Sequence, residues 1–217
     1  MILTHGANSL QRIIYVDGPV IGGRKYLAVK IGSQVWMAEN LDYKFSGCSI
    51  STPSNPITGK PNYPVAWYYN NDEGTYGSAG RRCGLLYTGW AAGYLETNKL
   101  SLIPSGWRVP YKSDFETLES FCGAAKAGKL LKSKDLPWFT DYGGVDKFGM
   151  RVLPAGVYWD SSFFGEGTTS QVWALGSVPG HPNNYYCIYF TKGHDELRMV
   201  RDGRDVGAAI RLIKDIT

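Results

Sequence analysis

The segment 26–38 constrains the fold of this chain more than any other, because its pattern is typical of a β-hairpin. Residues 26–31 read as an apolar strand, Gly32 and Ser33 as a two-residue turn, and residues 34–38 as the return strand. Two-residue turns that contain glycine join neighbouring antiparallel strands closely. We therefore expect an antiparallel sheet near the start of the chain.

The composition favours turns over long helices. The 217 residues include 27 glycines, 15 tyrosines and 7 tryptophans, and a hydrophobic content of 43% is enough to build a core. A net charge of +4 without any run of lysine and arginine argues against a nucleic-acid partner. No apolar stretch approaches the roughly 18 residues of a membrane span, so we expect no membrane insertion. The N-terminus lacks the pattern of a signal peptide, and display on a phage virion or a cell surface is compatible with the sequence.

The middle of the chain predicts two helices among much loop. Residues 46–80 are rich in Pro, Asn, Gly and Ser, so this long loop is either anchored by its aromatic rings or functional. Residues 84–98 predict the first helix. The second begins at Ser113, which forms a capping box with Glu116 ahead of an apolar stripe, and it ends at Gly123.

After residue 145, short apolar segments alternate with clusters of Gly, Pro, Asn and Asp, which is typical of antiparallel strands joined by turns. The last strand should close the sheet beside the first. With the hairpin and the two helices, these segments predict an α+β fold, in which two helices pack on short antiparallel sheets. The expected strands are 149–154, 171–175, 185–190, 197–201 and 208–213.

Six segments carry a family likeness when they are taken together and in order. They are VWMAENLDY (35–43), GLLYTGWAA (84–92), PSGWRVPYKSDFETL (104–118), AGKLLKS (127–133), FGMRVLPAG (148–156) and IRLIKD (210–215). In these segments the chain resembles the Fibrobacter succinogenes major paralogous domain family. The resemblance implies a C-type-lectin-like fold in residues 19–217, preceded by an N-terminal arm of residues 1–18.

The resemblance also implies a function. The family includes variable proteins of diversity-generating retroelements in gut bacteria and their phages, in which error-prone reverse transcription scatters substitutions over surface positions of the C-terminal part. The family's WWSS or FWSST segment stands here as VWALGS (172–177), and its GFSVRCVKD stands as GAAIRLIKD (207–215). These departures fit diversification of a C-terminal half at about residues 150–210, although ordinary drift explains them equally well.

An enzyme is the less favoured interpretation. Formylglycine-generating enzymes resemble this fold, but they need reactive cysteines near the C-terminal part, where this chain has only Cys187. The four cysteines have no CxxC spacing, so both two disulfides and four free thiols fit. Acidic turns at 70–74 and 202–205 could ligate calcium, but such turns usually serve only to solvate a loop. We therefore expect no catalytic residue, no metal site and no cofactor.

The C-terminal half is the expected binding surface. It combines Tyr, Trp, Phe, Asn, His, Asp and Arg with Gly and Ser turns, and antibody paratopes use the same residue types. A place in the strand core is the favoured alternative for Trp159, Phe163, Phe164, Trp173, Tyr186 and Phe190. The residues predicted to bind ligand are Tyr158, Phe163, His181, Asn183, Asn184, Tyr185, Tyr189, His194, Asp195, Arg198, Arg201, Arg204 and Asp205.

These observations lead to one expected function and two alternatives. We expect a non-catalytic protein that displays a diversified surface to a protein or glycan ligand on a target cell. The alternatives are a structural or adhesin-tip module of a surface appendage or phage tail, and an enzyme related to formylglycine-generating enzymes. The polar residues of the segment 35–43 belong to the scaffold in this interpretation: Glu39, Asn40 and Asp42 should hydrogen-bond the loop that follows.

Overall fold

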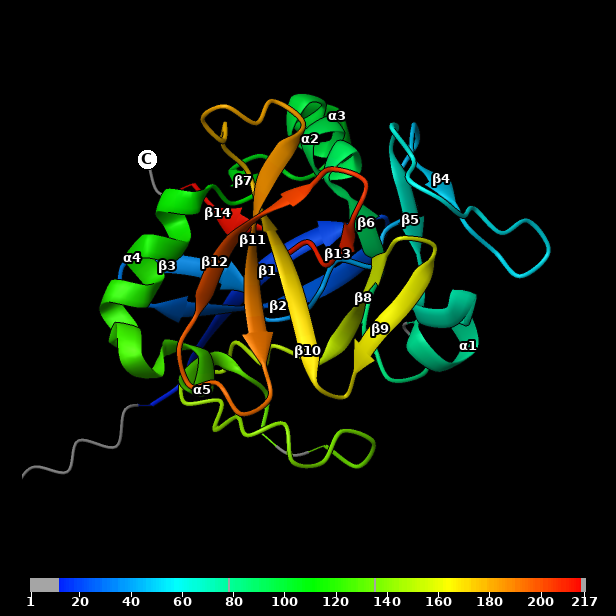
Figure 1. The fold of residues 1–217 in the computed structure, drawn as a ribbon. Helices are drawn as coiled ribbons and strands as arrows, with labels where there is room; N and C mark the ends of the chain where they lie inside the picture. Colours follow the sequence, from blue (N-terminus) through cyan, green and yellow to red (C-terminus); the bar gives the residue numbers. More distant parts are fainter. Residues whose placement is uncertain (1–11, 78, 135, 216–217) are drawn as a thin grey trace, which may run out of the picture.

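The predicted hairpin is confirmed in the computed structural model, which describes residues 12–77, 79–134 and 136–215 (Figure 1). Its strands are β2 (Arg24–Ile31) and β3 (Gln34–Met37), and Gly32 adopts the positive φ of 59° that suits the tight turn. These strands belong to a five-stranded sheet with the order β1-β2-β3-β14-β7. The other members are β1 (Ile14–Ile21), β7 (Trp107–Arg108) and β14 (Ile213–Lys214).

The two ends of the described chain meet in this first sheet, but not as predicted. Strand β14 pairs with β3 and β7, so the expectation that the last strand lies beside the first is wrong. Strand β1 includes residues 14–18, which were assigned to the N-terminal arm, and these residues pair with β2. Residues 1–11 of that arm lie outside the described residues.

A second, curled sheet carries the C-terminal half of the chain. Its order is β12-β11-β10-β8-β13-β6-β5-β4, and β9 pairs with β8 outside this order. The predicted strands at 171–175, 185–190 and 197–201 are confirmed, whereas 149–154 contributes only an isolated bridge at Val152. The strands are β4 (Ser49–Ile50), β5 (Val65–Trp67), β6 (Leu86–Thr88), β8 (Ala155–Trp159), β9 (Ser162–Glu166), β10 (Thr169–Ala174), β11 (Asn184–Thr191), β12 (Arg198–Gly203) and β13 (Gly207–Ala208).

The described residues contain five short α-helices where the sequence predicted two. The first predicted helix begins at Gly89 and not at residue 84, because 86–88 form β6 and the Thr88 hydroxyl accepts the Ala91 amide at 3.1 Å. The predicted capping box does not form, because the helix starts after Tyr111, whose amide donates to the Asp114 carboxylate at 2.7 Å. The helices are α1 (Glu73–Tyr76), α2 (Gly89–Thr97), α3 (Lys99–Leu102), α4 (Lys112–Cys122) and α5 (Ala127–Leu131), with 3-10 turns at Tyr69–Asn71 and Ala124–Lys126.

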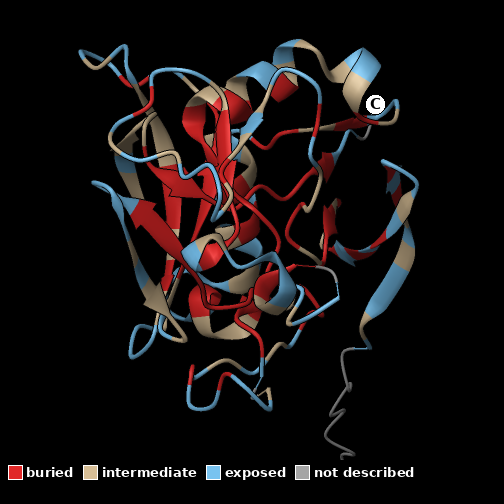
Figure 2. Cartoon of the chain, turned by 90° about the vertical axis from the view of Figure 1, so that its right-hand side faces the viewer, coloured by how far each residue is buried: buried red, intermediate tan, exposed pale blue. Residues whose placement is uncertain are grey.

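Strand β11 lies between two apolar clusters and is therefore buried on both faces at its centre. Ile188 and Phe190 pack with Trp36 of the first sheet and with α4, whereas Cys187 packs with Trp173 and the rings of β5 and β6. The alternation of one buried and one exposed face that is usual in a strand is consequently lost at this point. Figure 2 shows the buried residues running through both sheets while the exposed ones lie on connecting loops and outer strands.

A buried polar centre holds the first segment of the family likeness in place. Arg211 is fully buried, and its Nε donates to Asn40 Oδ1 at 2.7 Å. The Asn40 amide in turn donates to the Cys83 carbonyl at 2.8 Å. Glu39 accepts from the Leu27 amide, so it secures the preceding strand β2, whereas Asp42 accepts from Tyr68 in the following loop at 2.6 Å. The predicted hydrogen bond to the following loop is therefore confirmed for Asp42, whereas the prediction is wrong for Glu39, which bonds the preceding strand.

Candidate functional site

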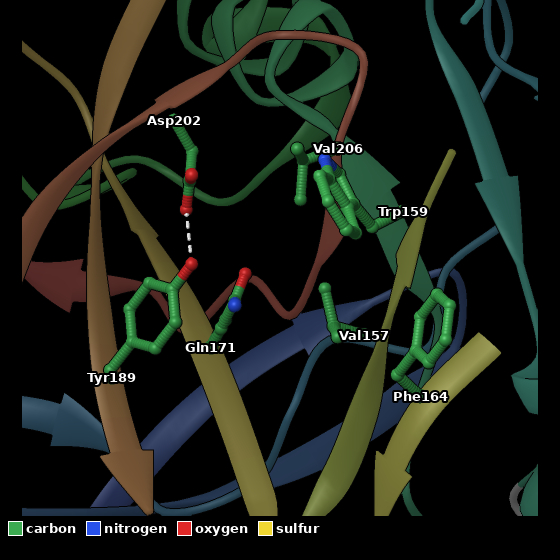
Figure 3. A pocket seen from close by; sticks show the side chains of 7 residues that line it. All are labelled: Val157, Trp159, Phe164, Gln171, Tyr189, Asp202 and Val206. Atoms are coloured by element: carbon green, nitrogen blue, oxygen red, sulfur yellow. Dashed lines mark hydrogen bonds between the residues drawn. The ribbon is translucent and has the colours of Figure 1, made fainter. Parts of the chain in front are cut away.

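A pocket of about 370 Å³ opens on the curled sheet, between strands of the C-terminal half (Figure 3). Its side chains come from β8, β9, β10, β11 and β12 and from the segment before β13. The close view shows a polar wall facing an apolar one. The polar wall is Gln171, Tyr189 and Asp202, and the apolar wall is Val157, Trp159, Phe164 and Val206.

The hairpin of β8 and β9 positions the two aromatic rings of the apolar wall. Its turn is made by Asp160 and Ser161, with φ values of 47° and 71°, which is the tight left-handed geometry of a two-residue hairpin. Trp159 is 56% exposed and Phe164 is 47% exposed, and their ring centroids lie 6.3 Å apart. Two neighbouring exposed rings of this kind are more typical of a binding surface than of scattered surface residues.

The polar wall is held by the pairing of the C-terminal strands. Gln171 of β10 lies opposite Tyr189 of β11, and the Tyr189 hydroxyl donates to Asp202 Oδ2 of β12 at 2.8 Å. The Cys187 thiol contributes behind this wall, where it donates to Gln171 Oε1 at 3.7 Å. The side chains therefore have fixed positions, while the second carboxylate oxygen of Asp202 has no hydrogen-bond partner among the described residues.

Burial changes the acidity of this pair. Loss of water raises the pKa of the Asp202 carboxyl group, and the nearby Asp205 carboxylate raises it further, although the hydrogen bond from Tyr189 opposes the change. Burial, and then the negative charge of Asp202, raise the pKa of the Tyr189 hydroxyl. Within the described part of the chain no lysine or arginine forms a salt bridge with Asp202. The polar wall therefore carries an uncompensated, half-buried acid.

Of the thirteen predicted residues, Tyr189 is the one that lines this pocket. Tyr185 precedes it by four residues on the same strand, and the Arg204 guanidinium is sandwiched 4.1 Å from the Tyr185 ring and 4.8 Å from the Trp90 ring. The Asn183 carbonyl accepts the Arg204 amide at 3.0 Å. These residues extend the surface from the pocket toward the start of β11.

The other predicted residues form separate groups. Arg198 and Arg201 are exposed, as expected, and Arg201 contacts His181. Asn184 and Asp205 are half-buried near the start of β11 and the end of β12. His194 and Asp195 lie in the loop after β11, where they contact Glu196 at 3.0 Å and Lys129 at 3.5 Å. Because β11 has eight residues, this loop is about 20 Å or more from Asn183, so the predicted residues do not form one site.

Two aromatic predictions need correction. Tyr158 is 2% exposed and its ring stacks on Trp67 at 4.1 Å, so it belongs to the core and not to the surface. Phe163 is half-buried and packs against Tyr158 at 5.1 Å. Conversely, Trp159 and Phe164 were expected in the strand core and are exposed, whereas Trp173 and Phe190 are buried as expected.

Sequence reasoning missed most of the pocket. Trp159 and Phe164 were assigned to the core, Gln171 was placed in a strand without a role, and Asp202 was considered only as a calcium ligand in its turn. One available signal was the alternation of side chains along a strand: if Tyr158 points inward, Trp159 must point outward. The partners on neighbouring strands had no such local signal.

The four cysteines are free thiols, which decides between the two predicted alternatives. Cys83 and Cys187 are buried, and Cys48 and Cys122 are half-buried. Burial raises the pKa of Cys48, Cys83 and Cys122 to about 12, and it raises that of Cys187 well above the ordinary value. Thiolates, which are the nucleophilic form, are therefore disfavoured at all four positions.

No group of three or more His, Cys, Asp or Glu side chains among the described residues is placed to hold a metal ion. None of the helices described is long and apolar enough to cross a membrane.

Comparison with known proteins gives a single family. The family model described as Fibrobacter succinogenes major domain matches residues 29–214. This range covers residues 29–37 of the hairpin, most of the two apolar clusters and every residue that lines the pocket. No curated protein and no solved structure matches the chain.

Proposed function

The chain belongs to the Fibrobacter succinogenes major domain family, and from this premise we propose that it is a non-catalytic ligand-binding protein with a C-type-lectin-like fold. In this proposal it displays a diversified surface, as the variable protein of a diversity-generating retroelement. The ligand is a protein or glycan on a target cell. The pocket on the curled sheet is the observation that carries the proposal, because two exposed rings and a fixed polar wall meet there.

The framework under the pocket supports a surface that varies. Strands β10, β11 and β12 are joined by continuous antiparallel backbone pairing, which does not depend on side-chain identity. The apolar contacts that stabilise them come from buried residues such as Trp173 and Ile188. Exposed positions such as Trp159 and Asn183 can therefore change at a cost that is usually within about 0.5 kcal/mol.

The chemistry of the polar groups supports binding over catalysis. A nucleophile needs an adjacent base or a lowered pKa, and burial raises the pKa of the Cys187 thiol and of the Tyr189 hydroxyl. The only acid of the pocket, Asp202, is bonded to Tyr189 and has no histidine beside it among the described residues. The pocket thus offers recognition groups without an activated nucleophile.

A binding screen tests the proposal directly. The purified protein would be screened against bacterial surface proteins and glycans, and each hit would be measured with Trp159→Ala and Asn183→Ala variants. We expect affinity losses of at least tenfold for the first variant, because it removes half of the exposed aromatic wall. Trp138→Ala is the matched control, because Trp138 is also exposed, at 43%, but does not line this pocket. Equal affinities for all three variants would contradict the proposed surface.

A genomic observation separates diversification from the adhesin-tip alternative. A variable protein should be encoded beside a reverse-transcriptase gene and a near-copy of its 3′ coding end, which differs only where the template has adenines. Codons for exposed residues of β8–β12 should be the ones that differ. If neither the gene nor the near-copy is present, the diversification part of the proposal is wrong, while ligand binding at the pocket is still tested by the screen.

A further inference from the structure

We propose that the pocket on the curled sheet binds a cationic side chain, a lysine or an arginine that a protein ligand projects into it. The inference rests on the proposed function and names the chemistry of its ligand. It is carried by the arrangement of the two walls, with an uncompensated carboxylate opposite exposed aromatic rings.

The carboxylate of Asp202 is the first observation. It has one hydrogen bond, from Tyr189 at 2.8 Å, and no salt bridge within the described residues. The neighbouring arginines do not neutralise it: Arg204 is stacked between Tyr185 and Trp90, and Arg198 is exposed without a salt bridge. A half-buried carboxylate in this state gains more from a cation than from a neutral group, because charge-assisted hydrogen bonds are about twice as strong as neutral ones.

The shape of the pocket is the second observation. Lysine and arginine have apolar stems and charged ends, so they bury the stem against apolar surface while the end meets polar groups. In Figure 3 Asp202, Tyr189 and Gln171 face the side formed by Val157 and Trp159. A stem that lies on the apolar wall would place its charged end against the carboxylate and the Gln171 amide oxygen. Exposed rings also attract cations through their faces.

A sugar is the main competing occupant, because sugars also stack on exposed tryptophan. A neutral sugar, however, would cover the Asp202 carboxylate without compensating its charge, and burying an unpaired charge is costly. Burial and the nearby Asp205 carboxylate raise the pKa of the Asp202 carboxyl group, and a bound cation would offset both effects. The balance of charge therefore favours the cation.

The test uses two small probes of nearly the same size that differ in charge. N-acetyl-arginine amide and N-acetyl-citrulline amide have nearly the same shape, but only the first is a cation. Each is titrated into the full chain by two-dimensional NMR, with the Trp159 indole signal assigned through the Trp159→Phe variant. We expect the arginine probe to shift this signal with an affinity at least tenfold higher than the citrulline probe.

Two variants connect the preference to the carboxylate. Asp202→Asn keeps the size of the side chain and removes its charge, so it should abolish the tenfold preference. Asp160→Asn is the matched control, because Asp160 is exposed one residue from Trp159, pairs with Lys60 at 3.5 Å, and does not line the pocket. Thermal unfolding verifies that both variants fold. If Asp202→Asn does not fold, Tyr189→Phe is tested in its place. This variant keeps the charge of Asp202 and should therefore retain the preference.

The outcomes separate this inference from the proposed function. Equal binding of both probes, a preference that survives Asp202→Asn, or no shift with either probe would overturn the cation assignment. Tighter binding of methyl glucoside, methyl mannoside or methyl galactoside than of the arginine probe would overturn it in favour of a sugar. In each of these cases the proposed function still stands or falls with the separate screen of surface proteins and glycans.

Discussion

Replacing Asn40 by alanine should destabilise the protein far more than the loss of one small polar side chain suggests. Asn40 is 1% exposed and connects two buried groups: it accepts from Arg211 Nε at 2.7 Å and donates to the Cys83 carbonyl at 2.8 Å. The substitution leaves the Arg211 Nε and the Cys83 carbonyl without this partner, although the guanidinium still donates to the Met150 and Arg151 carbonyls. A buried carbonyl without a hydrogen bond costs about 1–3 kcal/mol, and the loss of a hydrogen bond by a buried charged group costs at least as much. We therefore expect the free energy of unfolding to fall by about 3–5 kcal/mol.

This loss can be measured by urea unfolding followed by far-ultraviolet circular dichroism. It would remove a large fraction of a typical domain's stability of about 5–15 kcal/mol, and it should lower the midpoint while the slope stays constant. Asn183→Ala is the matched control, because Asn183 is exposed, and its free energy of unfolding should change by less than about 0.5 kcal/mol. A loss below about 1 kcal/mol for Asn40→Ala would refute the reasoning.

A double-mutant cycle identifies the cause of the loss. Arg211 is fully buried, and burial lowers the pKa of its guanidinium to about 10, so the acceptors around it must stabilise a buried cation. In an Arg211→Met background, Asn40→Ala should cost only the bond to Cys83, or about 1–3 kcal/mol. A coupling free energy of at least about 1.5 kcal/mol between the two substitutions is therefore expected, and strict additivity would show that the two side chains act independently.

Three further predictions follow from the site and the core. Because burial raises the pKa of Asp202 in the folded state, its ionised form costs stability above that pKa. Asp202→Asn should therefore unfold at a higher urea concentration than the wild type at pH 7, and the difference should vanish near pH 3. A difference that does not change with pH would contradict this. With a pKa of about 12, the Cys122 thiol should react with iodoacetamide at pH 8 roughly a thousandfold more slowly in the folded protein than in urea, and similar rates would exclude the raised pKa. Trp173→Ala should lower the free energy of unfolding by about 3–5 kcal/mol, because the Trp173 ring is buried and its Nε1 donates to the Tyr87 carbonyl at 2.6 Å. Trp159→Ala should lower it by less than about 1 kcal/mol, because Trp159 is exposed. The order of the two losses would be reversed if Trp159 were the core residue.

The elements that the sequence predicted correctly are those whose cause lies within a few residues. The turn at Gly32 joins two strands directly, so the hairpin needs no distant partner. The stripe that includes Phe115 and Leu118 and the stop at Gly123 are likewise local, and the body of α4 was correct even though its cap was misplaced by two residues. The apolar runs that form β10 and β11 were also predicted, because strands longer than a few residues show a recognisable run of apolar residues in the sequence.

The pocket depended on information that no single segment contains. Whether a ring such as Trp159 faces water or the core is set by the strands that pair with its own, and a shift of one residue reverses the answer. Asp202, Tyr189 and Gln171 are neighbours only because β10, β11 and β12 pair in one register. The sequence by itself therefore determined the family, the hairpin and most C-terminal strands. Only the tertiary structure decided which side chains meet at the pocket, because contacts between strands arise from long-range pairing and not from local preference.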